Sequence, residues 1–363
     1  MSDIAKADKN MATSTASDDG LIWRSADDDA FQLSGLAFHH KGEPFRRLPL
    51  NPVPAEPNEG VTYLAWHTSG VMLRFRSDTL RVAVKSDAYY GELMDHMAQT
   101  GNCGCDLYID GKFIGVSRYP VLQKQYQVDL FNCPGAERKM RDFCINFPLY
   151  DGVKSFDVGI ETGAKLAAHS PWSRKGRIVW YGTSIEQGGC ASRPGTGLTN
   201  IVSRALNTEI INLAFSGSGR GEPEMGELMC QVPDPAMFVL DYEANVLTGE
   251  RMRSTLPVLI DILRAKYPCL PIVVVSRIPF SHDILPGYTD NTSRESRIEG
   301  VEIQRIEVER RRAAGDGNIS FIDGGELLGE DFWECTVDGI HPTDLGFRRM
   351  ADCLVPRLAA VLN

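Results

Sequence analysis

The hydrophobic period of this sequence changes near residue 165, and the change separates two kinds of fold. From about Leu21 to Ile160 apolar residues alternate with polar ones, whereas after residue 175 short runs of Val, Ile and Leu are each followed by a helix-length segment. Alternation is typical of strands with one buried face, and continuous apolar strands followed by helices indicate a parallel sheet covered on both faces. The sequence therefore predicts an all-β domain over residues 21–165 and an α/β domain over residues 176–363. The first 20 residues are rich in Ser, Ala, Asp and Lys, and we expect residues 1–20 to form a disordered tail.

The N-terminal half contains two predicted hairpins. Residues 71–76 and 80–85 alternate in polarity on either side of a polar turn, and residues 107–109 and 113–116 flank the dipeptide Asp110-Gly111. Asp-Gly supplies the positive φ angles of a two-residue hairpin turn. Further strands are predicted at Tyr63–Trp66, Tyr126–Phe131, Arg141–Phe147 and Phe156–Ile160. Because no convincing long amphipathic helix interrupts these segments, this half is expected to be an all-β sandwich, jelly-roll-like in architecture.

The C-terminal half alternates strands with helices. Strands are expected at Ile178–Tyr181, Ile210–Phe215, Met237–Asp241, Ile272–Val275 and Ile319–Ile322, and helices at Leu198–Leu206, Glu222–Gln231, Arg251–Lys266, Ser293–Ala313 and Asp344–Val361. In parallel sheets of this kind, ligands bind beyond the carboxyl ends of the strands. The chemistry of the chain is therefore expected in the loops that follow the strands.

Two of these loops carry a serine and a glycine-rich run. Ser184 stands between small residues in Gly182-Thr183-Ser184-Ile185, where a strand-to-helix turn would expose its hydroxyl close to backbone N–H groups. The ordinary alternative for such a serine is a helix cap or a turn residue. The run 212–219 contains Gly217 and Gly219, and glycine lets a backbone N–H approach a ligand closely. A flexible connection is the alternative for this loop.

Two further polar groups follow later strands. Asn245 could donate a side-chain N–H to an oxyanion, or it could cap the next helix. Asp338 and His341 lie three residues apart in a turn, where the carboxylate can orient the imidazole and support its protonated form. Each group is weak evidence alone, but all four segments are expected at one edge of the same sheet.

These segments resemble the four blocks of the SGNH/GDSL hydrolase superfamily, in the same order. The matching strings are GTSI, NLAFSGSG, the Asn after the third strand, and DGIHPTDLGF. The longer string GTSIEQGGCASRPG resembles the branch of GDSL-like lipases/acylhydrolases with an N-terminal β-domain, which is marked by a GxDLY motif. Residues 104–108, Gly-Cys-Asp-Leu-Tyr, match that motif. The resemblance implies a flavodoxin-like, three-layer catalytic domain after the β-sandwich.

The resemblance also implies roles for individual residues. Ser184 would be the nucleophile, and Asp338 and His341 would complete a catalytic triad. The oxyanion hole would consist of the Ser184 backbone N–H, the Gly217 backbone N–H and the Asn245 side chain. Neither a metal nor an organic cofactor is required by this chemistry.

The sequence departs from the superfamily pattern in places that could bear on substrate. Thr183 stands where an Asp usually precedes the nucleophile, and Glu243 stands two positions before Asn245 in place of a Gly. The Glu243 carboxylate could repel anionic substrates or bind a sugar hydroxyl, or it could be solvated or paired with an arginine. Arg193, shortly after the nucleophile, could orient substrate or hold a loop in place.

We therefore expect a serine esterase that hydrolyses small acyl esters, chiefly acetyl, on carbohydrate. The expectation of small acyl groups on carbohydrate rests on relatives with an added β-domain. A thioesterase or lysophospholipase-like acylhydrolase would use the same triad and differ in acyl-chain preference. A carbohydrate-binding protein with a vestigial hydrolase half is the alternative from another class, and the complete set of triad residues argues against it.

Charge and apolar patterning limit the partners. The formal net charge is −10 and no Lys/Arg-rich run occurs, which argues against nucleic acid. No apolar stretch approaches the roughly 20 residues of a membrane span, and residues 1–20 lack the apolar core of a secretory signal. The nine cysteines form neither a disulfide framework nor a zinc site, since Cys103 and Cys105 make only a CxC pair. We expect a cytoplasmic protein with a small-molecule or carbohydrate ester as its partner, and the sequence leaves a homo-oligomer open.

Overall fold

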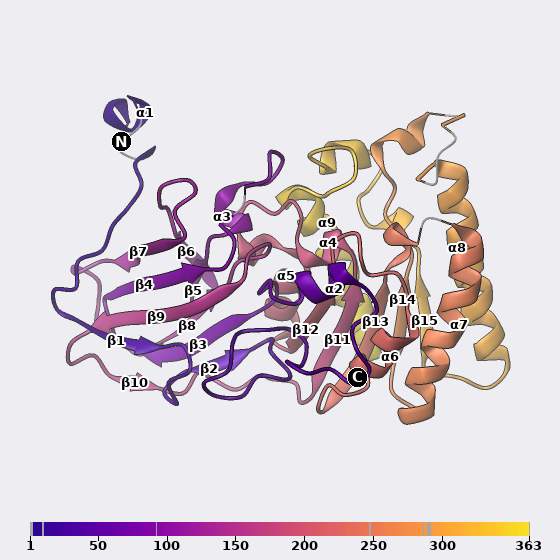
Figure 1. Ribbon diagram of the computed structural model, residues 1–363, viewed down its shortest axis with the longest axis horizontal. Coiled ribbons are helices and arrows are strands. Elements are labelled where there is room, and N and C mark those ends of the chain that lie inside the picture. The colour runs from indigo at the N-terminus through magenta and orange to yellow at the C-terminus, as the bar shows by residue number, and fades with distance from the viewer. Residues whose placement is uncertain are drawn as a thin grey trace. The chain divides into compact units, whose positions relative to one another are not determined.

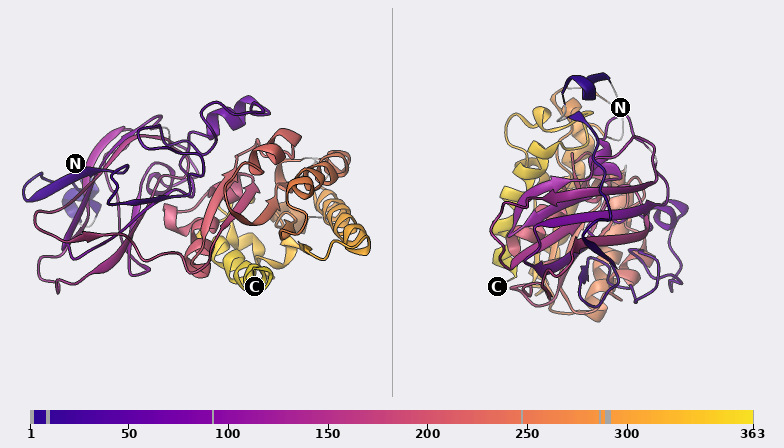
Figure 2. Two further views of the ribbon diagram at one scale, coloured as in Figure 1. Left: turned by 90° about the horizontal axis from the view of Figure 1, so that it is seen from below. Right: turned by 90° about the vertical axis from the view of Figure 1, so that its left-hand side faces the viewer.

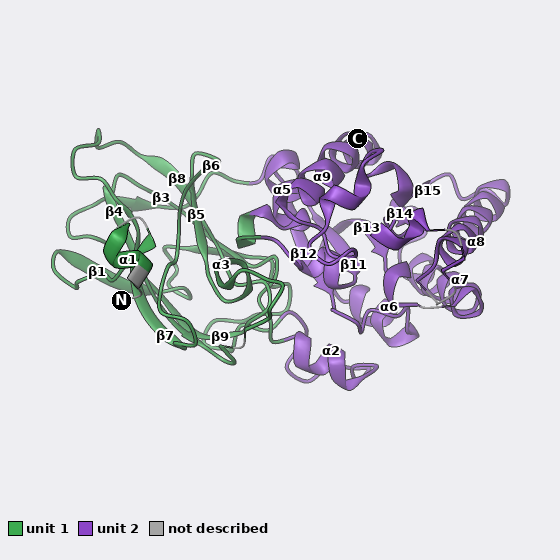
Figure 3. Ribbon diagram, turned by 90° about the horizontal axis from the view of Figure 1, so that it is seen from above, with its two compact units in different colours: residues 1–46, 66–171, 192–195 green, residues 47–65, 172–191, 196–363 purple. Residues whose placement is uncertain are grey.

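The computed structural model describes residues 3–8, 11–91, 93–246, 248–285, 287–288 and 292–362. The chain forms two compact units, coloured green and purple in Figure 3. Unit 1 comprises residues 1–46, 66–171 and 192–195, and unit 2 comprises residues 47–65, 172–191 and 196–363. Each unit is therefore assembled from more than one stretch of the sequence.

Unit 1 contains two sheets whose strands are antiparallel to their neighbours. The first has the order β1-β9-β4-β7, and its strands run side by side in the right-hand view of Figure 2. The second has the order β10-β3-β8-β5-β6, with β2 also paired to β3. The strands are β1 (Leu21–Ser25), β2 (Gln32–Ser34), β3 (Met72–Ser77), β4 (Arg81–Ala88), β5 (Asp106–Ile109), β6 (Lys112–Val116), β7 (Gln125–Asn132), β8 (Arg141–Asn146), β9 (Val153–Glu161) and β10 (Leu166–Ala167), accompanied by the short helices α1 (Asp3–Ala7) and α3 (Gln99–Asn102).

One hydrophobic core joins the two sheets of unit 1. Leu73 and Phe75 of β3 and Val82 and Val84 of β4 are fully buried in the same cluster, although β3 and β4 belong to different sheets. The rings of Phe75 and Phe143 stack with their centroids 5.0 Å apart. The predicted all-β sandwich is therefore confirmed.

The two predicted hairpins have different outcomes. β5 and β6 pair as predicted around Asp110 and Gly111, which have φ angles of 49° and 74°. The predicted hairpin of residues 71–85 is wrong, because β3 pairs with β8 and β4 pairs with β7 and β9. Alternation identified the buried face of each strand but not its partner, and the turn at residues 78–80 carries the chain from one sheet to the other.

Part of the expected tail is attached to unit 1. Of residues 1–20, residues 1, 2, 9 and 10 lie outside the described part. The Ser14 backbone N–H donates to the Arg118 carbonyl at 2.9 Å, and the backbone groups of Ala16 bond the backbone and side chain of Gln127 at 3.1 and 2.9 Å. The chain is thus hydrogen bonded to unit 1 from Ser14 onward, in contrast to the expectation of disorder.

Unit 2 is built on a five-stranded parallel sheet with the order β12-β11-β13-β14-β15. Numbered along this domain the order is 2-1-3-4-5, that of flavodoxin-like folds, so the predicted fold class is confirmed. The strands are β11 (Arg177–Gly182), β12 (Glu209–Ala214), β13 (Pro235–Asp241), β14 (Ile272–Val275) and β15 (Ile319–Ile322). The helices are α2 (Glu59–Leu64), α4 (Ser184–Gln187), α5 (Leu198–Leu206), α6 (Pro223–Met229), α7 (Gly249–Lys266), α8 (Arg294–Ala313) and α9 (Asp344–Val361). Figures 1 and 3 show α5 and α9 on one side of this sheet and α6 and α7 on the other.

Helix α2 corrects one predicted strand. The segment Tyr63–Trp66 was expected to be extended, but Tyr63 and Leu64 end helix α2. Asn58 caps this helix by accepting the Val61 backbone N–H at 2.9 Å, and Val61 and Leu64, three residues apart, are its buried residues. Among the described residues, no helix is both long and apolar enough to cross a membrane.

Candidate active site

The turn after β11 places Ser184 at the start of helix α4. Thr183 caps this helix, since its Oγ1 accepts the Ile185 backbone N–H at 3.3 Å. Glu186 reaches back and accepts the Thr183 backbone N–H at 2.8 Å and the Thr183 hydroxyl at 3.0 Å. This reciprocal arrangement is a capping box, and it fixes the angle at which the chain leaves the strand. Gly182 is required here, because a Cβ would collide with the Glu186 side chain.

The side chains of Ser184, His341 and Asp338 form one hydrogen-bonded line. His341 Nε2 lies 2.8 Å from Ser184 Oγ, and His341 Nδ1 lies 2.7 Å from Asp338 Oδ2. Ser184 is 8% exposed, so the residue is largely enclosed. A carboxylate on Nδ1 fixes the tautomer in which Nε2 can accept the serine proton. The structure thus brings together the three residues that the sequence nominated for the triad.

Backbone hydrogen bonds hold Asp338 in its turn. Asp338 Oδ1 accepts the backbone N–H groups of Ile340 and His341 at 3.0 and 2.8 Å, which leaves Oδ2 directed at the imidazole. Partial burial acts to raise the pKa of the Asp338 carboxyl, but the hydrogen bonds from the His341 side chain and from these two N–H groups outweigh burial and hold the pKa below its usual value. The carboxylate is therefore ionised throughout the neutral range.

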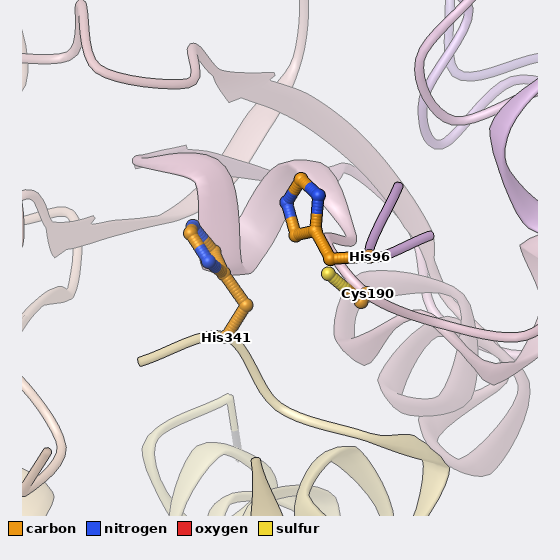
Figure 4. Close-up of side chains that lie close together, drawn as sticks. All are labelled: His96, Cys190 and His341. Atoms are coloured by element: carbon orange, nitrogen blue, oxygen red, sulfur yellow. The ribbon is translucent and has the colours of Figure 1, made fainter. Parts of the chain in front are cut away.

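A second contact fixes the turn that carries His341. The Cys190 backbone N–H donates to the Pro342 carbonyl at 3.0 Å, and the Val337 N–H donates to the His341 carbonyl at 2.9 Å. The Cys190 Sγ lies within 4.8 Å of a ring nitrogen of His341 (Figure 4). The loop that follows the nucleophile is thus tied to the loop that carries the imidazole.

Of the three predicted oxyanion donors, Ser184 follows β11, and the other two lie on the loops that follow β12 and β13. Gly217 follows β12, has a φ of 65° and is exposed, and its backbone N–H has no hydrogen-bond acceptor within the described ranges. Asn245 ends the short 3-10 helix Glu243–Asn245 after β13, and its Nδ2 donates to the Phe215 carbonyl at 3.3 Å. An amide nitrogen carries two hydrogens, so Asn245 retains a second N–H for a ligand.

Two buried carboxyls beneath the nucleophile were missed by the sequence reasoning. Asp241, at the end of β13, pairs in register with Gly182 and is 6% exposed, and Glu186 is 2% exposed. The two carboxyls are electrostatic neighbours, and Asp241 Oδ2 is buried without a hydrogen-bond partner among the described residues. Burial raises the pKa of Glu186 to about 6, and burial together with the neighbouring Glu186 raises the pKa of Asp241 well above its usual value. The Thr-x-x-Glu spacing of a capping box was the signal for Glu186, whereas nothing in the sequence indicates its contact with Asp241.

Glu243 faces the protein interior. Its Oε2 accepts the Arg277 backbone N–H at 2.8 Å and Gln304 Nε2 at 2.6 Å, and the residue is 8% exposed. Burial raises the pKa of the Glu243 carboxyl to about 7. This position differs from the substrate-facing and the solvated alternatives that we considered for Glu243.

Arg193 lies within unit 1, with its guanidinium on residues of the GxDLY motif. Arg193 Nη1 donates to Asp106 Oδ2 at 2.8 Å and to the Tyr108 hydroxyl at 2.6 Å, and the guanidinium lies 3.8 Å from the Phe113 ring centroid. The Gly195 backbone N–H donates to the same Asp106 oxygen at 2.9 Å. These contacts correspond to the alternative in which Arg193 holds a loop in place. Asp106 and Tyr108 of the GxDLY motif bind that arginine and so have a structural role.

Both halves of the sequence match known family models. Residues 175–359 match the model of the GDSL-like lipase/acylhydrolase family, and residues 21–166 match the model of the N-terminus of SGNH-hydrolase-type esterases, the GxDLY domain. The two matches together cover most of the chain. A search of curated proteins found no match.

Several solved structures share the fold over nearly the whole chain. A protein described as a GDSL-like lipase from Bacteroides ovatus ATCC 8483 is 28% identical, with a TM-score of 0.84, over 94% of this chain and 98% of that one. The salicylyl-acyltransferase SsfX3 of a tetracycline biosynthetic pathway is 21% identical, with a TM-score of 0.76 and the same coverage. A family two carbohydrate esterase from Cellvibrio japonicus is 15% identical, with a TM-score of 0.59 and the same coverage. The protein belongs to the GDSL-like lipase/acylhydrolase family of SGNH hydrolases, with the N-terminal GxDLY domain, and is a carboxylic ester hydrolase.

Proposed function

We propose that the protein is a serine esterase that removes small acyl groups, chiefly acetyl, from carbohydrate esters through an acyl-enzyme intermediate. The observation that carries the serine mechanism is the line from Ser184 Oγ through His341 to Asp338, with hydrogen-bond distances of 2.8 and 2.7 Å. A serine hydroxyl is a weak nucleophile until a positioned base accepts its proton. His341 is that base, and Asp338 orients it.

In the first half of the reaction the acyl group moves from the substrate to the enzyme. Ser184 Oγ attacks the ester carbonyl carbon while His341 Nε2 takes the hydroxyl proton, and Asp338 stabilises the imidazolium that results. The oxyanion accepts hydrogen bonds from the backbone N–H groups of Ser184 and Gly217 and from Asn245 Nδ2. When the C–O bond to the leaving alcohol breaks, His341 returns the proton to the departing oxygen.

In the second half water replaces the alcohol. His341 removes a proton from water as the water oxygen attacks the acyl carbon, and the same donors stabilise the second tetrahedral oxyanion. Collapse breaks the bond to Ser184 Oγ, which recovers its proton from His341. The products are a carboxylic acid and the free enzyme.

The choice of substrate rests on the fold comparison and on charge. The carbohydrate esterase from Cellvibrio japonicus has a similar fold over 94% of this chain. The formal net charge of −10 suits a neutral sugar ester better than a polyanion. A thioesterase or lysophospholipase-type activity would use the same site, and acyl-chain preference separates these activities.

The test is a comparison of initial rates on p-nitrophenyl acetate, butyrate and octanoate for wild type, Ser184→Ala and Ser254→Ala. Ser254 is an exposed serine on α7 and serves as the matched control. We expect acetate to be the best substrate, Ser184→Ala to be inactive and Ser254→Ala to behave as wild type. Release of acetate from acetylated xylan then tests the carbohydrate alcohol. A preference for octanoate or for acyl-CoA would reject the acetyl assignment, and a fully active Ser184→Ala would reject the mechanism.

A further inference from the structure

Strand β12 lies at the edge of the sheet in unit 2, and a buried arginine covers that edge. β12 comes first in the strand order, and within the described part of the chain it pairs with β11 alone. The carbonyls that point away from β11 therefore have no strand partner there. Arg47 Nη1 donates to two of these carbonyls, that of Asn212 at 2.9 Å and that of Ala214 at 2.8 Å. Arg47 is fully buried. Its guanidinium therefore takes the place that a neighbouring strand would have at this edge.

The same guanidinium joins the strand edge to helix α2. Arg47 Nη2 donates to the carbonyl of Leu64, the last residue of α2, at 2.8 Å. The guanidinium carbon lies 4.7 Å from the Phe215 ring centroid, within the range of a cation–π contact. One side chain thus holds together a helix end, the carboxyl end of β12 and the first residue of the loop that follows it.

That loop, residues 215–219, carries Gly217. The Phe215 carbonyl accepts the backbone N–H groups of Ser218 and Gly219, both at 2.9 Å, as well as Asn245 Nδ2. Asn58, the cap of α2, donates from Nδ2 to the Ser218 carbonyl at 3.3 Å. Both ends of the loop are therefore attached to the segment 47–65, which precedes them in sequence by more than 150 residues.

We propose that Arg47 is a positioning residue for the oxyanion hole, which fixes the loop 215–219 so that the Gly217 N–H is aimed at the developing oxyanion. This inference rests on the proposed serine esterase function. The Gly217 N–H acts only if it is held at hydrogen-bond distance from the oxyanion position, and its loop has no regular secondary structure to hold it. Arg47 and Asn58 supply that support from outside the loop. Arg47 acts on this loop through the carbonyls of Asn212 and Ala214 and the ring of Phe215.

The geometry makes Arg47 difficult to replace. A planar guanidinium presents several donors in a fixed fork, which lets one side chain bond the carbonyls of Asn212, Ala214 and Leu64 together. A lysine offers donors from one nitrogen only and reaches fewer of these carbonyls. A methionine fills a similar volume but leaves all three buried carbonyls without this donor.

The experiment compares Arg47→Met and Arg47→Lys with the control Arg264→Met. Arg264 on α7 is also a largely buried arginine that donates to backbone carbonyls, those of Tyr267 and Leu270, but at the amino ends of the strands. The measurements are kcat and KM on p-nitrophenyl acetate, the affinity for a methyl trifluoromethyl ketone, and hydrogen–deuterium exchange of the segment 212–219. The ketone forms a tetrahedral oxyanion adduct with the nucleophilic serine and therefore reports on the oxyanion donors.

We expect Arg47→Met to lower kcat by about 10- to 100-fold, with KM changed less than threefold, since one well-placed oxyanion donor is worth about 10²–10³-fold and a displaced donor retains part of that. The ketone affinity should fall by the same factor, exchange in the segment 212–219 should rise, and Arg47→Lys should lie between wild type and Arg47→Met. Arg264→Met should keep kcat and ketone affinity within threefold of wild type, even where it lowers the melting temperature.

A folded Arg47→Met with unchanged kcat and ketone affinity overturns the inference. If Arg47→Met does not fold, the test uses Arg47→Lys and Asn58→Ala instead. A wild-type kcat in both of these variants rejects the inference. If wild type hydrolyses no ester, the proposed function has failed. Hydrogen–deuterium exchange then tests, without reference to activity, whether Arg47 holds the segment 212–219 in place. Equal exchange of the segment 212–219 in wild type and Arg47→Lys would then reject the inference, and faster exchange in the variant would support it.

Discussion

The carboxyl of Asp338 and the carboxyls of Glu186 and Asp241 lie in the same unit but in opposite environments. The Asp338 side chain is 32% exposed and accepts three hydrogen bonds from His341 and Ile340, which keep its pKa low. Glu186 and Asp241 are buried, and burial keeps their pKa values high. Asp338 is suited to stabilising a cation, whereas Glu186 is suited to holding the Thr183 turn and Asp241 to remaining neutral beside it. The residue type alone therefore does not predict the charge of a carboxyl, which depends on how far burial outweighs the hydrogen-bond donors around it.

The largest effect is expected from removing the charge of Asp338. Asp338→Asn keeps the shape but no longer fixes the His341 tautomer or stabilises the imidazolium, so kcat should fall by about 10³–10⁴-fold. Hydrolysis of p-nitrophenyl acetate at neutral pH measures this. Asp331→Asn is the control, since Asp331 is an exposed carboxylate paired with Arg349. A loss of less than tenfold in Asp338→Asn would show that the exposed carboxylate is not the functional one.

A smaller effect, chiefly on stability, is expected from Glu186. Glu186→Ala removes the acceptor of the Thr183 N–H and hydroxyl, and it should lower the free energy of unfolding by about 2–4 kcal/mol. Glu186→Gln keeps an acceptor oxygen and should lose much less. Urea unfolding of both variants measures the difference. Equal stability of the Ala and Gln variants would mean that the capping box does not hold the nucleophile turn.

The raised pKa of Glu243 predicts a pH-dependent stability. The folded protein binds the Glu243 proton more tightly than the unfolded chain, so this carboxyl favours folding most at low pH, and its contribution is lost as pH rises from about 4.5 through about 7. Glu243→Gln lacks this dependence, and its stability relative to wild type should rise by about 1–3 kcal/mol between pH 5 and pH 8. Urea unfolding at the two pH values tests this, with the exposed Glu227→Gln on α6 as the control. A constant difference across the range would contradict a buried, proton-binding Glu243.

The smallest effect is expected from Asp241→Asn. An asparagine imitates a protonated aspartate and keeps a neutral polar group beside the buried Glu186 carboxyl, so kcat/KM should change by less than about threefold at neutral pH. Steady-state rates from pH 5 to 9 provide the measurement, and Asp241→Leu provides the contrast, because it leaves Glu186 buried without that partner. A large loss of rate in Asp241→Asn would show that the buried pair acts in the chemistry and is not only a support.

The sequence predicted the candidate active site of unit 2 more fully than the parts that support it. The strands and helices of the α/β half could be located because each is a continuous apolar run or an amphipathic segment, and Ser184 and His341 stand in recognisable loops at their ends. The pairing of β3 with β8 could not be found, since alternation carries no information about a strand's neighbour. The hydrogen bonds of Arg47 to Asn212 and Ala214 of β12 could not be predicted either, because the partners are separated by 165 and 167 positions in the sequence.

The interleaving of the two units limits how this protein can be cut. A fragment beginning at residue 176 would contain the complete parallel sheet and the triad but would lack α2 and Arg47. The carbonyls of Asn212 and Ala214 would then face water on a bare strand edge, which is a template for pairing with a second copy. Such a truncation is expected to be prone to aggregation, and a recombinant form that replaces all of the sequence before residue 176 would meet the same obstacle, because it loses residues 47–65 of unit 2. The two units are therefore expected to be inherited as one piece, whatever the substrate.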